Sequence, residues 1–320
     1  MTPALEIASA GGLNRVAVVV EAPFDQVLRG NPALDRVIVP RGRGELWSRW
    51  KCIREIRSFK PDVVFDMHGG TTSALMTRFS RSRIRVGFAA SRNARSYNVK
   101  VPDSRSIWGR GNLHTVEHQL SPLKYTGFRF DEIPPLRIPV DEEIKKRISQ
   151  SLGESGIKGR FVLIHPAAAF ETKRWRVGGF ATVARELAAR GIPCVATSGP
   201  GQEILLEQLA ESAGKGLTIV PPGPLPEFTA LASLCHLYLG NDTGPTHIAA
   251  ALKKKIVAVF GSSNHVAWHP WNTEYKLLRS KLPCVPCPGY KCLHYPEPEC
   301  ILSITPDQVM KAVLDLFERE

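Results

Sequence analysis

Residues able to bind an anion or move a proton are concentrated in the segment Gly240–His247. Its polar members follow one another closely: Asp242, Thr243, Gly244, Thr246 and His247. Apolar runs on both sides predict a buried strand ending at Leu239 and another over Ile256–Phe260, with a short Ala-rich helix from Pro245 between them. A loop at the carboxyl end of a parallel strand, leading into a helix N-terminus, favours a phosphate. An ordinary capped helix with a core histidine has the same pattern, so the segment alone leaves both interpretations open.

A second loop, Pro166–Trp175, follows the predicted strand Phe161–His165. It contains Lys173 and Arg174, and an amphipathic helix over 177–190 comes next. A lysine in a strand-end loop acts as a point charge on a phosphate group, and a nearby helix start favours the same anion. Lys173 is therefore a candidate phosphate ligand, although a merely exposed lysine fits the same position.

Four of the seven cysteines lie close together in the sequence, with the spacing Cys-x2-Cys-x4-Cys-x7-Cys: Cys284, Cys287, Cys292 and Cys300. This spacing is compatible with a structural zinc or iron–sulfur site, with free thiols and with disulfides. The other three, Cys52, Cys194 and Cys235, fall in helical or core-like contexts. An odd number of cysteines in such contexts favours a reducing cytoplasm over a secreted disulfide scaffold.

Charge is distributed unevenly along the chain. Residues 1–150 contain 25 Lys or Arg and 15 Asp or Glu, whereas residues 151–320 contain 17 and 15. A basic half favours an anionic partner, either nucleic acid, an anionic membrane face or an acidic substrate, although an Arg-rich proteome gives the same bias. The chain carries no helix-turn-helix, zinc-finger or RNA-binding signature, so we predict no nucleic-acid partner. A run of about 18 apolar residues, which a membrane span needs, does not occur.

The predicted strands and helices alternate along the chain, which indicates an α/β protein with parallel sheets. A proline-rich linker over 131–140 predicts an N-terminal domain, residues 1–140, a C-terminal domain, residues 141–304, and a terminal helix, residues 305–320. Residues 88–115 lack periodicity and are predicted to form a long surface loop. Its cations, available to the phosphates of an acceptor or simply solvated, are Arg92, Arg95, Lys100, Arg105 and Arg110.

Several motifs taken together resemble the ADP-heptose:lipopolysaccharide heptosyltransferase family, glycosyltransferase family 9. They are GNDTGPTHIAAAL followed by VAVFGSSN, then Trp268, Pro270 and CVPC, with HPAAAFETKRW upstream and NPALDRVIV near the start. The resemblance covers nearly the whole chain and is strongest from Phe161 to Ile304. It implies a GT-B fold, in which two Rossmann-like domains face each other across a cleft and the terminal helix crosses back to the N-terminal domain.

The resemblance also implies roles for single residues. Lys173 would contact the diphosphate of the donor, and Glu203 would bind its ribose hydroxyls. The other residues predicted to bind the donor are Asp242, Thr243, Gly244, Thr246 and His247. Glu203 is also an ordinary residue for the first turn of a helix, so its role stays open. No catalytic metal and no cofactor beyond an ADP-sugar donor is implied.

The catalytic carboxylate of the family belongs to a Gly-Asp loop that precedes a Thr-Pro pair. This sequence opens at Thr2-Pro3, inside what resembles the first helix, so that carboxylate and the first strand of the N-terminal domain have no counterpart in it. Either the start lies too late, which we favour, or the protein departs from the family here. The substitutes for a catalytic base are Asp66 and His68, at the end of a predicted strand.

The resemblance implies an inverting glycosyltransferase that moves heptose from ADP-heptose to a lipopolysaccharide inner-core acceptor. The expected partners are a nucleotide-sugar donor in the C-terminal domain and an anionic glycolipid in the basic N-terminal domain. The expected location is cytoplasmic, peripheral at the inner membrane. A catalytically impaired binding homologue that lacks the acid-bearing loop is the first alternative, and a basic nucleic-acid-binding protein with a cysteine-rich metal module is the second.

Overall fold

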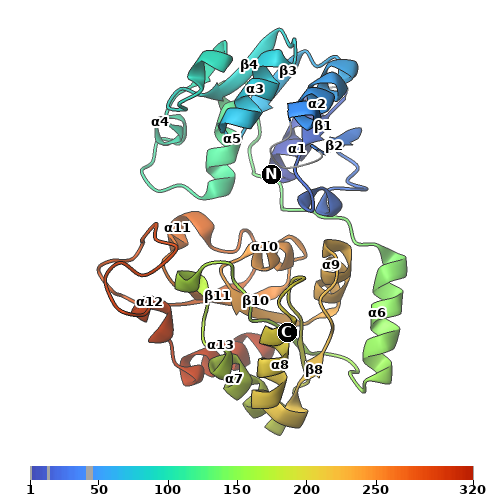
Figure 1. Cartoon of the computed structure of the whole chain (residues 1–320), viewed down its shortest axis with the longest axis vertical. Helices are drawn as coiled ribbons and strands as arrows, with labels where there is room; N and C mark the ends of the chain where they lie inside the picture. Colours follow the sequence, from blue (N-terminus) through green and yellow to red (C-terminus); the bar gives the residue numbers. More distant parts are fainter. Residues whose placement is uncertain (1, 13–14, 41–45, 320) are drawn as a thin grey trace. The chain divides into compact units, whose positions relative to one another are not determined.

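The chain folds into two compact units, Met1–Pro139 and Val140–Glu320, in a computed structural model that describes residues 2–12, 15–40 and 46–319 (Figure 1). The predicted domain boundary, between residues 140 and 141, lies one residue from this division. Within the described residues every strand pair is parallel, as the alternation of strands and helices predicts. The α/β class with parallel sheets is therefore confirmed.

The first unit contains two parallel sheets. One is β1 (Ala17–Val19) with β2 (Arg36–Ile38); the other has the order β3 (Val63–Asp66), β4 (Ile84–Phe88), β5 (Val99–Val101). The helical segments are α1 (Thr2–Ala10), η1 (Phe24–Val27), α2 (Leu46–Phe59), α3 (Thr71–Phe79), η2 (Ala94–Ser96), α4 (Ser104–Trp108) and α5 (Thr115–Tyr125). The interpretation that the first strand of the family is missing ahead of α1 stays a prediction.

The prediction of an irregular loop over residues 88–115 is wrong, because β5 and α4 lie within it. The Asp103 carboxylate accepts a hydrogen bond from the Arg105 N–H and caps α4, and Gly109 ends the helix at a φ of 65°. Val99–Val101 pairs with β4. Elements of five residues or fewer are too short to show a period in the sequence.

The second unit is built on one parallel sheet in the order β11-β10-β9-β6-β7-β8. Its strands are β6 (Val162–His165), β7 (Cys194–Ala196), β8 (Thr218–Ile219), β9 (Leu237–Asn241), β10 (Lys255–Phe260) and β11 (Tyr275–Arg279). Its helical segments are α6 (Glu142–Glu154), η3 (Glu171–Lys173), α7 (Val177–Ala189), α8 (Glu203–Ala213), η4 (Gly214–Gly216), α9 (Leu225–Leu234), α10 (Gly244–Ala251), α11 (His265–Trp268), α12 (Glu299–Leu302) and α13 (Pro306–Phe317).

Helices cover the two faces of this sheet. The side chains of α7, α8 and α13 form one core cluster with the sheet, whereas α10 contacts β9, β10 and α9. Strands covered on both faces read as continuous apolar runs, and β6 and β9 are buried throughout. The apolar face of α13 is therefore used within the second unit; its predicted return to the first domain stays a prediction.

One strand of this sheet escaped the sequence analysis. Tyr275–Arg279 forms the edge strand β11, beside β10, in a segment where the sequence pattern predicted no strand. Its sequence, YKLLR, has two adjacent leucines and does not alternate between apolar and polar residues. The ammonium group of Lys276 forms an ion pair with Asp315 on α13, which holds the edge strand against the terminal helix.

The order of the strands defines a switch point in the sheet. From β6 the chain proceeds to β7 and β8 on one side, and then returns to place β9 on the other side of β6. The loops after β6 and β9 therefore leave the sheet side by side, in opposite directions. Ligands of open α/β sheets bind in the crevice at this place, outside the carboxyl ends of the strands.

Helices long enough and apolar enough to cross a bilayer do not occur within the described residues.

Candidate functional site

Asp242 lies at the centre of a group of polar side chains at the switch point. Its carboxylate, 3% exposed, follows β9 directly. Lys173, in the loop after β6, donates from Nζ to Asp242 Oδ2 over 2.8 Å. His247 Nε2, on the first turns of α10, lies 3.7 Å from Asp242 Oδ1, and Ser263 Oγ, after β10, donates to Asp242 Oδ2. Three neighbouring strands thus bring together one anion, one cation, one imidazole and one hydroxyl.

The electrostatic balance at Asp242 favours its charged form. Burial by itself raises the pKa of this carboxyl group, because it disfavours a charge. Hydrogen bonds with His247, Lys173 and Ser263, and the charge of Lys173, outweigh that effect, so the pKa lies below its usual value. Lys173 therefore has a fixed anionic partner on one side and remains 25% exposed on the other.

Hydrogen bonds tie the loops after β6 and β9 to each other. The fully buried Asn241 donates from Nδ2 to the Pro166 carbonyl over 2.8 Å, and its Oδ1 accepts from the Trp175 N–H over 3.1 Å. Arg174 donates from Nε and Nη2 to the Ala168 carbonyl inside the same loop. The position of Lys173 is thus set by a framework that is complete within this unit.

The start of α10 is shaped for close approach of a ligand. Thr243 occupies the N-cap position, makes no side-chain cap hydrogen bond among the described residues, and precedes the exposed Gly244. Thr246 is fully buried, and its hydroxyl donates to the Asn241 carbonyl. Of the residues predicted to hold the donor, Thr246 therefore supports the turn from inside, while Gly244 lies on its surface.

A pocket of about 410 Å³ opens beside Lys173 and Ser263. Its aromatic walls are Phe170, Trp268 and Tyr290, and the rings of Phe170 and Tyr290 lie 4.5 Å apart. Ser262 and Asn264 add polar groups to the lining. Aromatic walls with a few fixed polar groups, next to a cation, suit a compact organic ligand that carries a phosphate.

The far wall of this pocket belongs to the cysteine-rich segment. Thr172 donates from Oγ1 to the Gly289 carbonyl over 2.8 Å, and the Cys287 N–H donates to the Ser262 carbonyl over 2.8 Å. Gly261 permits this approach, since a Cβ there would lie 1.9 Å from the Thr172 carbonyl oxygen. The segment is thereby fixed against the loops that hold Lys173 and Ser263.

A zinc or iron–sulfur site was one alternative for the four clustered cysteines, and the described residues contain no preformed site of this kind. Within the described residues, no group of three or more Cys, His, Asp or Glu side chains is arranged to hold a metal ion. The thiols of Cys284, Cys287, Cys292 and Cys300 are free in the structure. The interior thiols are inert at neutral pH, because burial raises the pKa of Cys194 and Cys235 to about 12.

Glu203 lies at the first position of α8, after β7, which neighbours β6. Its carboxylate Oε1 accepts a hydrogen bond from the Gly201 N–H over 3.1 Å, and the side chain is exposed. A smaller pocket of about 240 Å³ is lined by Ser198 from the same loop and by Phe228. Glu203 therefore lies at the carboxyl edge of the sheet. It follows β7, the strand next to β6, whose loop carries Lys173.

His165, at the end of β6, is a buried group that the sequence analysis did not single out. Burial lowers the pKa of its imidazole to about 4, so the ring is neutral at physiological pH. The ring packs edge-on against Phe228 at 5.6 Å. It therefore adds no positive charge beneath the loop of Lys173.

The substitutes for the catalytic base lie at the end of β3 in the first unit. Asp66 is 4% exposed, and its Oδ1 accepts from the N–H groups of His68 and Gly69 over 3.0 and 2.8 Å. Its Oδ2 accepts from the Tyr97 hydroxyl over 2.8 Å. Burial and the bond to Asp66 raise the pKa of Tyr97 to about 12. Asp66 thus holds the loop, while the imidazole of His68 is exposed.

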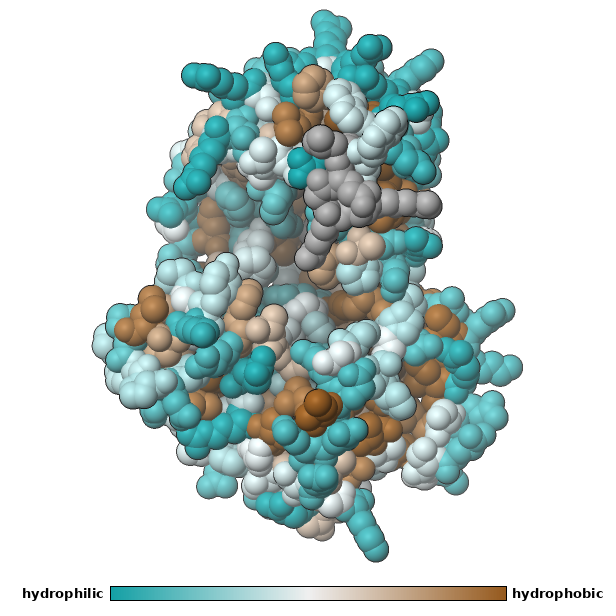
Figure 2. Space-filling model, in the orientation of Figure 1, coloured by the Kyte–Doolittle hydropathy of each residue, from teal (hydrophilic) through white to brown (hydrophobic). Residues whose placement is uncertain are grey.

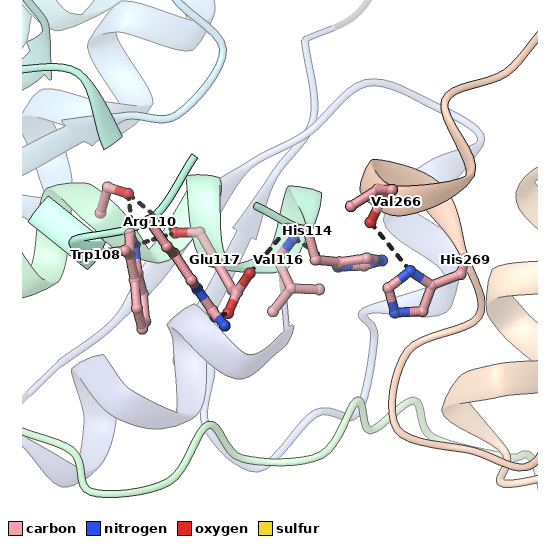
Figure 3. A network of polar contacts seen from close by, with 8 residues as sticks. Trp108, Arg110, His114, Val116, Glu117, Val266 and His269 are labelled. Carbon is pink, nitrogen blue, oxygen red and sulfur yellow. Dashed lines mark hydrogen bonds and ion pairs between the residues drawn. The ribbon is translucent and has the colours of Figure 1, made fainter. Parts of the chain in front are cut away.

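Two of the cations predicted to meet an acceptor have carboxylate partners of their own. Arg105 Nε lies 4.0 Å from Asp103 Oδ1. Arg110 forms an ion pair with the buried carboxylate of Glu117 on α5 (Figure 3). Glu117 also accepts from the His114 N–H over 2.8 Å, and its carbonyl accepts from Trp108 Nε1 over 3.0 Å. Arg92, Arg95, Lys100 and Arg105 are exposed.

The same figure draws His269 of the second unit, whose Nδ1 lies 3.1 Å from the Val266 carbonyl.

A family model described as glycosyltransferase family 9 (heptosyltransferase) matches residues 49–296. The chain belongs to this family. Lipopolysaccharide heptosyltransferase 3 of Escherichia coli strain K12 is 28% identical over 223 residues, which are 68% of this chain and 64% of that protein. Lipooligosaccharide heptosyltransferase 2 of Campylobacter jejuni (serotype O:6) is 26% identical over 219 residues, 64% of this chain and 66% of that protein. The chain thus spans just under two thirds of the length of these curated relatives.

Solved structures resemble the whole chain. A glycosyltransferase family 9 protein from Veillonella parvula has a TM-score of 0.84 at 21% identity, with 99% of this chain and 92% of that chain covered. ADP-heptose lipopolysaccharide heptosyltransferase II of Escherichia coli has a TM-score of 0.80 at 18% identity, with 99% and 93% covered. At these identities the likeness shows the fold, and it is the fold that the sequence motifs predict.

Proposed function

We propose that this protein transfers heptose from ADP-heptose to an inner-core acceptor of lipopolysaccharide, with inversion at the anomeric carbon. The observation that carries the proposal is the pair of Lys173 and Asp242 at the switch point, beside a pocket of about 410 Å³. The similarity to lipopolysaccharide heptosyltransferases supports the choice of heptose, and the likeness to an ADP-heptose heptosyltransferase supports the donor.

In this proposal the second unit binds the donor. Lys173 contacts the diphosphate, and the backbone at Thr243 and Gly244 approaches it from the start of α10. Asp242 holds Lys173 in place and His247 orients the carboxylate or the phosphate. The heptose occupies the pocket walled by aromatic rings, and Glu203 meets the ribose hydroxyls on the opposite side.

The chemistry then follows from charge development. An acceptor hydroxyl attacks the anomeric carbon of the heptose, the bond to the β-phosphate oxygen breaks, and the departing diphosphate gains negative charge. Lys173 and the helix start stabilise that charge, which is the largest contribution this unit can make to the rate. A general base takes the proton from the acceptor hydroxyl. We leave the base unassigned, because both oxygens of Asp66 already accept hydrogen bonds.

The acceptor side of the proposal rests on the basic character of residues 1–150, with 25 cationic and 15 anionic side chains. The exposed cations Arg92, Arg95, Lys100 and Arg105 suit the phosphates of an anionic glycolipid. We propose that the protein works at the cytoplasmic face of the inner membrane, where such an acceptor is presented, and that it needs no metal ion for the transfer.

The proposal is tested by incubating the protein with ADP-heptose and a heptose-deficient lipopolysaccharide, and following the acceptor by mass spectrometry. We expect the acceptor to gain one heptose and ADP to accumulate in equal amount. The Lys173→Met variant is the matched negative control. Binding of ADP without any transfer would contradict the enzyme assignment and favour the binding homologue, whereas absence of ADP binding would contradict both.

A further inference from the structure

The first unit exposes an aromatic and aliphatic patch on the helices α2 and α3. Trp47 on α2 is 86% exposed and Trp50 is 49% exposed, while Leu75 and Phe79 on α3 are each 40% exposed. The rings of Trp50 and Phe79 lie 5.8 Å apart, so the two helices share the patch. Figure 2 shows brown and tan atoms among teal ones over the region where Figure 1 places these helices.

The spacing on α2 explains why the tryptophans face outward. Trp47, Trp50, Lys51 and Arg54 repeat at intervals of three and four residues and therefore share one face of the helix. The opposite face carries Cys52, Ile53 and Ile56, which are buried in a cluster with Met76 of α3. The core is thus filled without Trp47 and Trp50, and folding of this unit does not account for their presence at the surface.

The surroundings of the patch are strongly basic. Residues 46–60 and 71–83 together contain eight Lys or Arg and a single acidic residue, Glu55. Lys51, Arg54 and Arg78 are exposed. Arg57 is fixed by a hydrogen bond from its Nε to the Phe79 carbonyl over 2.7 Å, which leaves its charge beside the patch.

We propose that this face of α2 and α3, with Trp47, Trp50, Leu75 and Phe79 at its centre, docks the protein onto the surface of an anionic phospholipid bilayer. Tryptophan rings favour the headgroup level of a membrane, where their apolar body and polar N–H are both satisfied. Amphipathic helices with a cationic rim bind anionic lipids through buried apolar area and charge together. The excess of cations selects an anionic bilayer over an apolar protein surface as the occupant.

A second group of exposed apolar side chains, in the second unit, can be compared with the patch on α2 and α3. Leu293 and Tyr290 in the second unit are 76% and 67% exposed. Their segment has both signs of charge nearby, with Lys291 on one side and Glu297 and Glu299 on the other. This group lacks the cationic excess that the proposal requires, so its substitution serves as a matched control.

The test measures binding of the full chain to lipid vesicles by sedimentation, with vesicles containing phosphatidylglycerol and with vesicles of phosphatidylcholine alone. We expect binding to the anionic vesicles, weakened by high salt, and little binding to the neutral ones. The double substitution Lys51→Gln/Arg54→Gln should weaken binding by about fivefold for each cation removed. The double substitution Trp47→Ser/Trp50→Ser should weaken it by at least about tenfold.

The controls are Leu293→Ser for exposed apolar area and Lys158→Gln/Lys215→Gln for exposed charge, and both should bind as the wild type does. A second readout keeps the test independent of folding defects. Brominated lipids should quench the tryptophan fluorescence of the wild type, and this quenching should disappear in the Trp47→Ser/Trp50→Ser variant although four tryptophans remain. Failure of the wild type to bind anionic vesicles, or unchanged binding of both double variants, would overturn the proposal.

The readout needs neither donor nor acceptor, so its outcome is separate from that of the proposed transfer reaction. Vesicle binding through this face without any heptose transfer would support the proposed docking surface and contradict the enzyme assignment. Heptose transfer by a protein that binds vesicles equally well without Trp47 and Trp50 would support the enzyme assignment and contradict the proposed docking surface.

Discussion

Two buried aspartates, Asp242 and Asp66, each lie at the carboxyl end of a parallel strand, yet their partners differ. Asp242 is bonded to the ammonium group of Lys173 and lies beside the imidazole of His247. Among the described residues, the donors to Asp66 are neutral, namely two backbone N–H groups and the Tyr97 hydroxyl. The first arrangement keeps a partly exposed cation next to a pocket, whereas the second closes a turn. We therefore propose ligand binding at Asp242, whose cationic partner is partly exposed to solvent, and a structural role for Asp66.

The first prediction concerns Lys173, the cation that distinguishes the surroundings of Asp242 from those of Asp66. Replacing Lys173 by Met removes the proposed phosphate ligand and also leaves Asp242 without its ion-pair partner. A hydrogen bond to a charged group contributes about 1.5–3 kcal/mol, so we expect the affinity for ADP to fall by roughly 10- to 150-fold in isothermal titration calorimetry. Lys158→Met, at an exposed position of the same unit, is the control. Unchanged ADP affinity would rule out the assignment of Lys173.

The second prediction concerns the pH dependence of stability. The folded-state pKa of Asp242 lies below its ordinary value of 3.8, so the carboxylate stabilises the fold above that pH and loses the contribution as the pH falls through the folded pKa. Asp242→Asn should lower the free energy of unfolding at neutral pH by about 1.5–3 kcal/mol. Urea unfolding should show this difference shrinking below about pH 4. A difference that stays constant down to the lowest pH would show that the charge of Asp242 contributes nothing.

The two-unit organisation and the elements around the candidate donor loop could be predicted from the sequence. The strand, helix and strand of Leu237–Gly261 appear as β9, α10 and β10, because their apolar runs and glycines are local signals. Ser263 and Asn241 were missed as members of the site. Their bonds to Asp242, Pro166 and Trp175 join residues that are 21 to 75 positions apart, and local patterns contain no information on such pairs.

In the first unit, too, a contact between residues that are distant in the sequence could not be predicted. Asp66 looked like a candidate base because it follows a buried strand and precedes His68. Its partner Tyr97 lies 31 residues away, within a segment that we had predicted to be an irregular loop. The structural role of Asp66 depends on β5 and the turn before it, which are too short to recognise by period. The burial of Thr246 was missed for a related reason, since its hydroxyl turns back to the Asn241 carbonyl inside one turn.

The third prediction separates catalysis from structure at His247. Its side chain is 30% exposed and is joined to Asp242 rather than packed in the core. Replacing His247 by Ala should reduce the turnover number by about tenfold, as removal of a positioned polar group at a charged transition state does. The melting temperature should stay within a few degrees of that of the wild type. An early melting transition with normal turnover would instead establish a structural histidine.

The smallest effect is expected in the first unit. Tyr97→Phe removes one neutral hydrogen bond to Asp66 and should lower the free energy of unfolding by about 1 kcal/mol. The affinity for ADP should not change, because the proposed donor site lies in the second unit and Tyr97 and Asp66 belong to the first. Urea unfolding and calorimetry on the same preparation check both statements. A loss of ADP affinity in this variant would contradict the division of roles between the two aspartates.

The most direct measurement of the central claim compares the affinities of ADP and AMP for the wild type and for Lys173→Met. In the proposed site the terminal phosphate of ADP lies on Lys173, so the wild type should bind ADP at least about tenfold more tightly than AMP. Lys173→Met should bind the two nucleotides equally. Equal affinities in the wild type, or a preference for ADP that survives in Lys173→Met, would show that the switch point of the second unit does not hold the diphosphate.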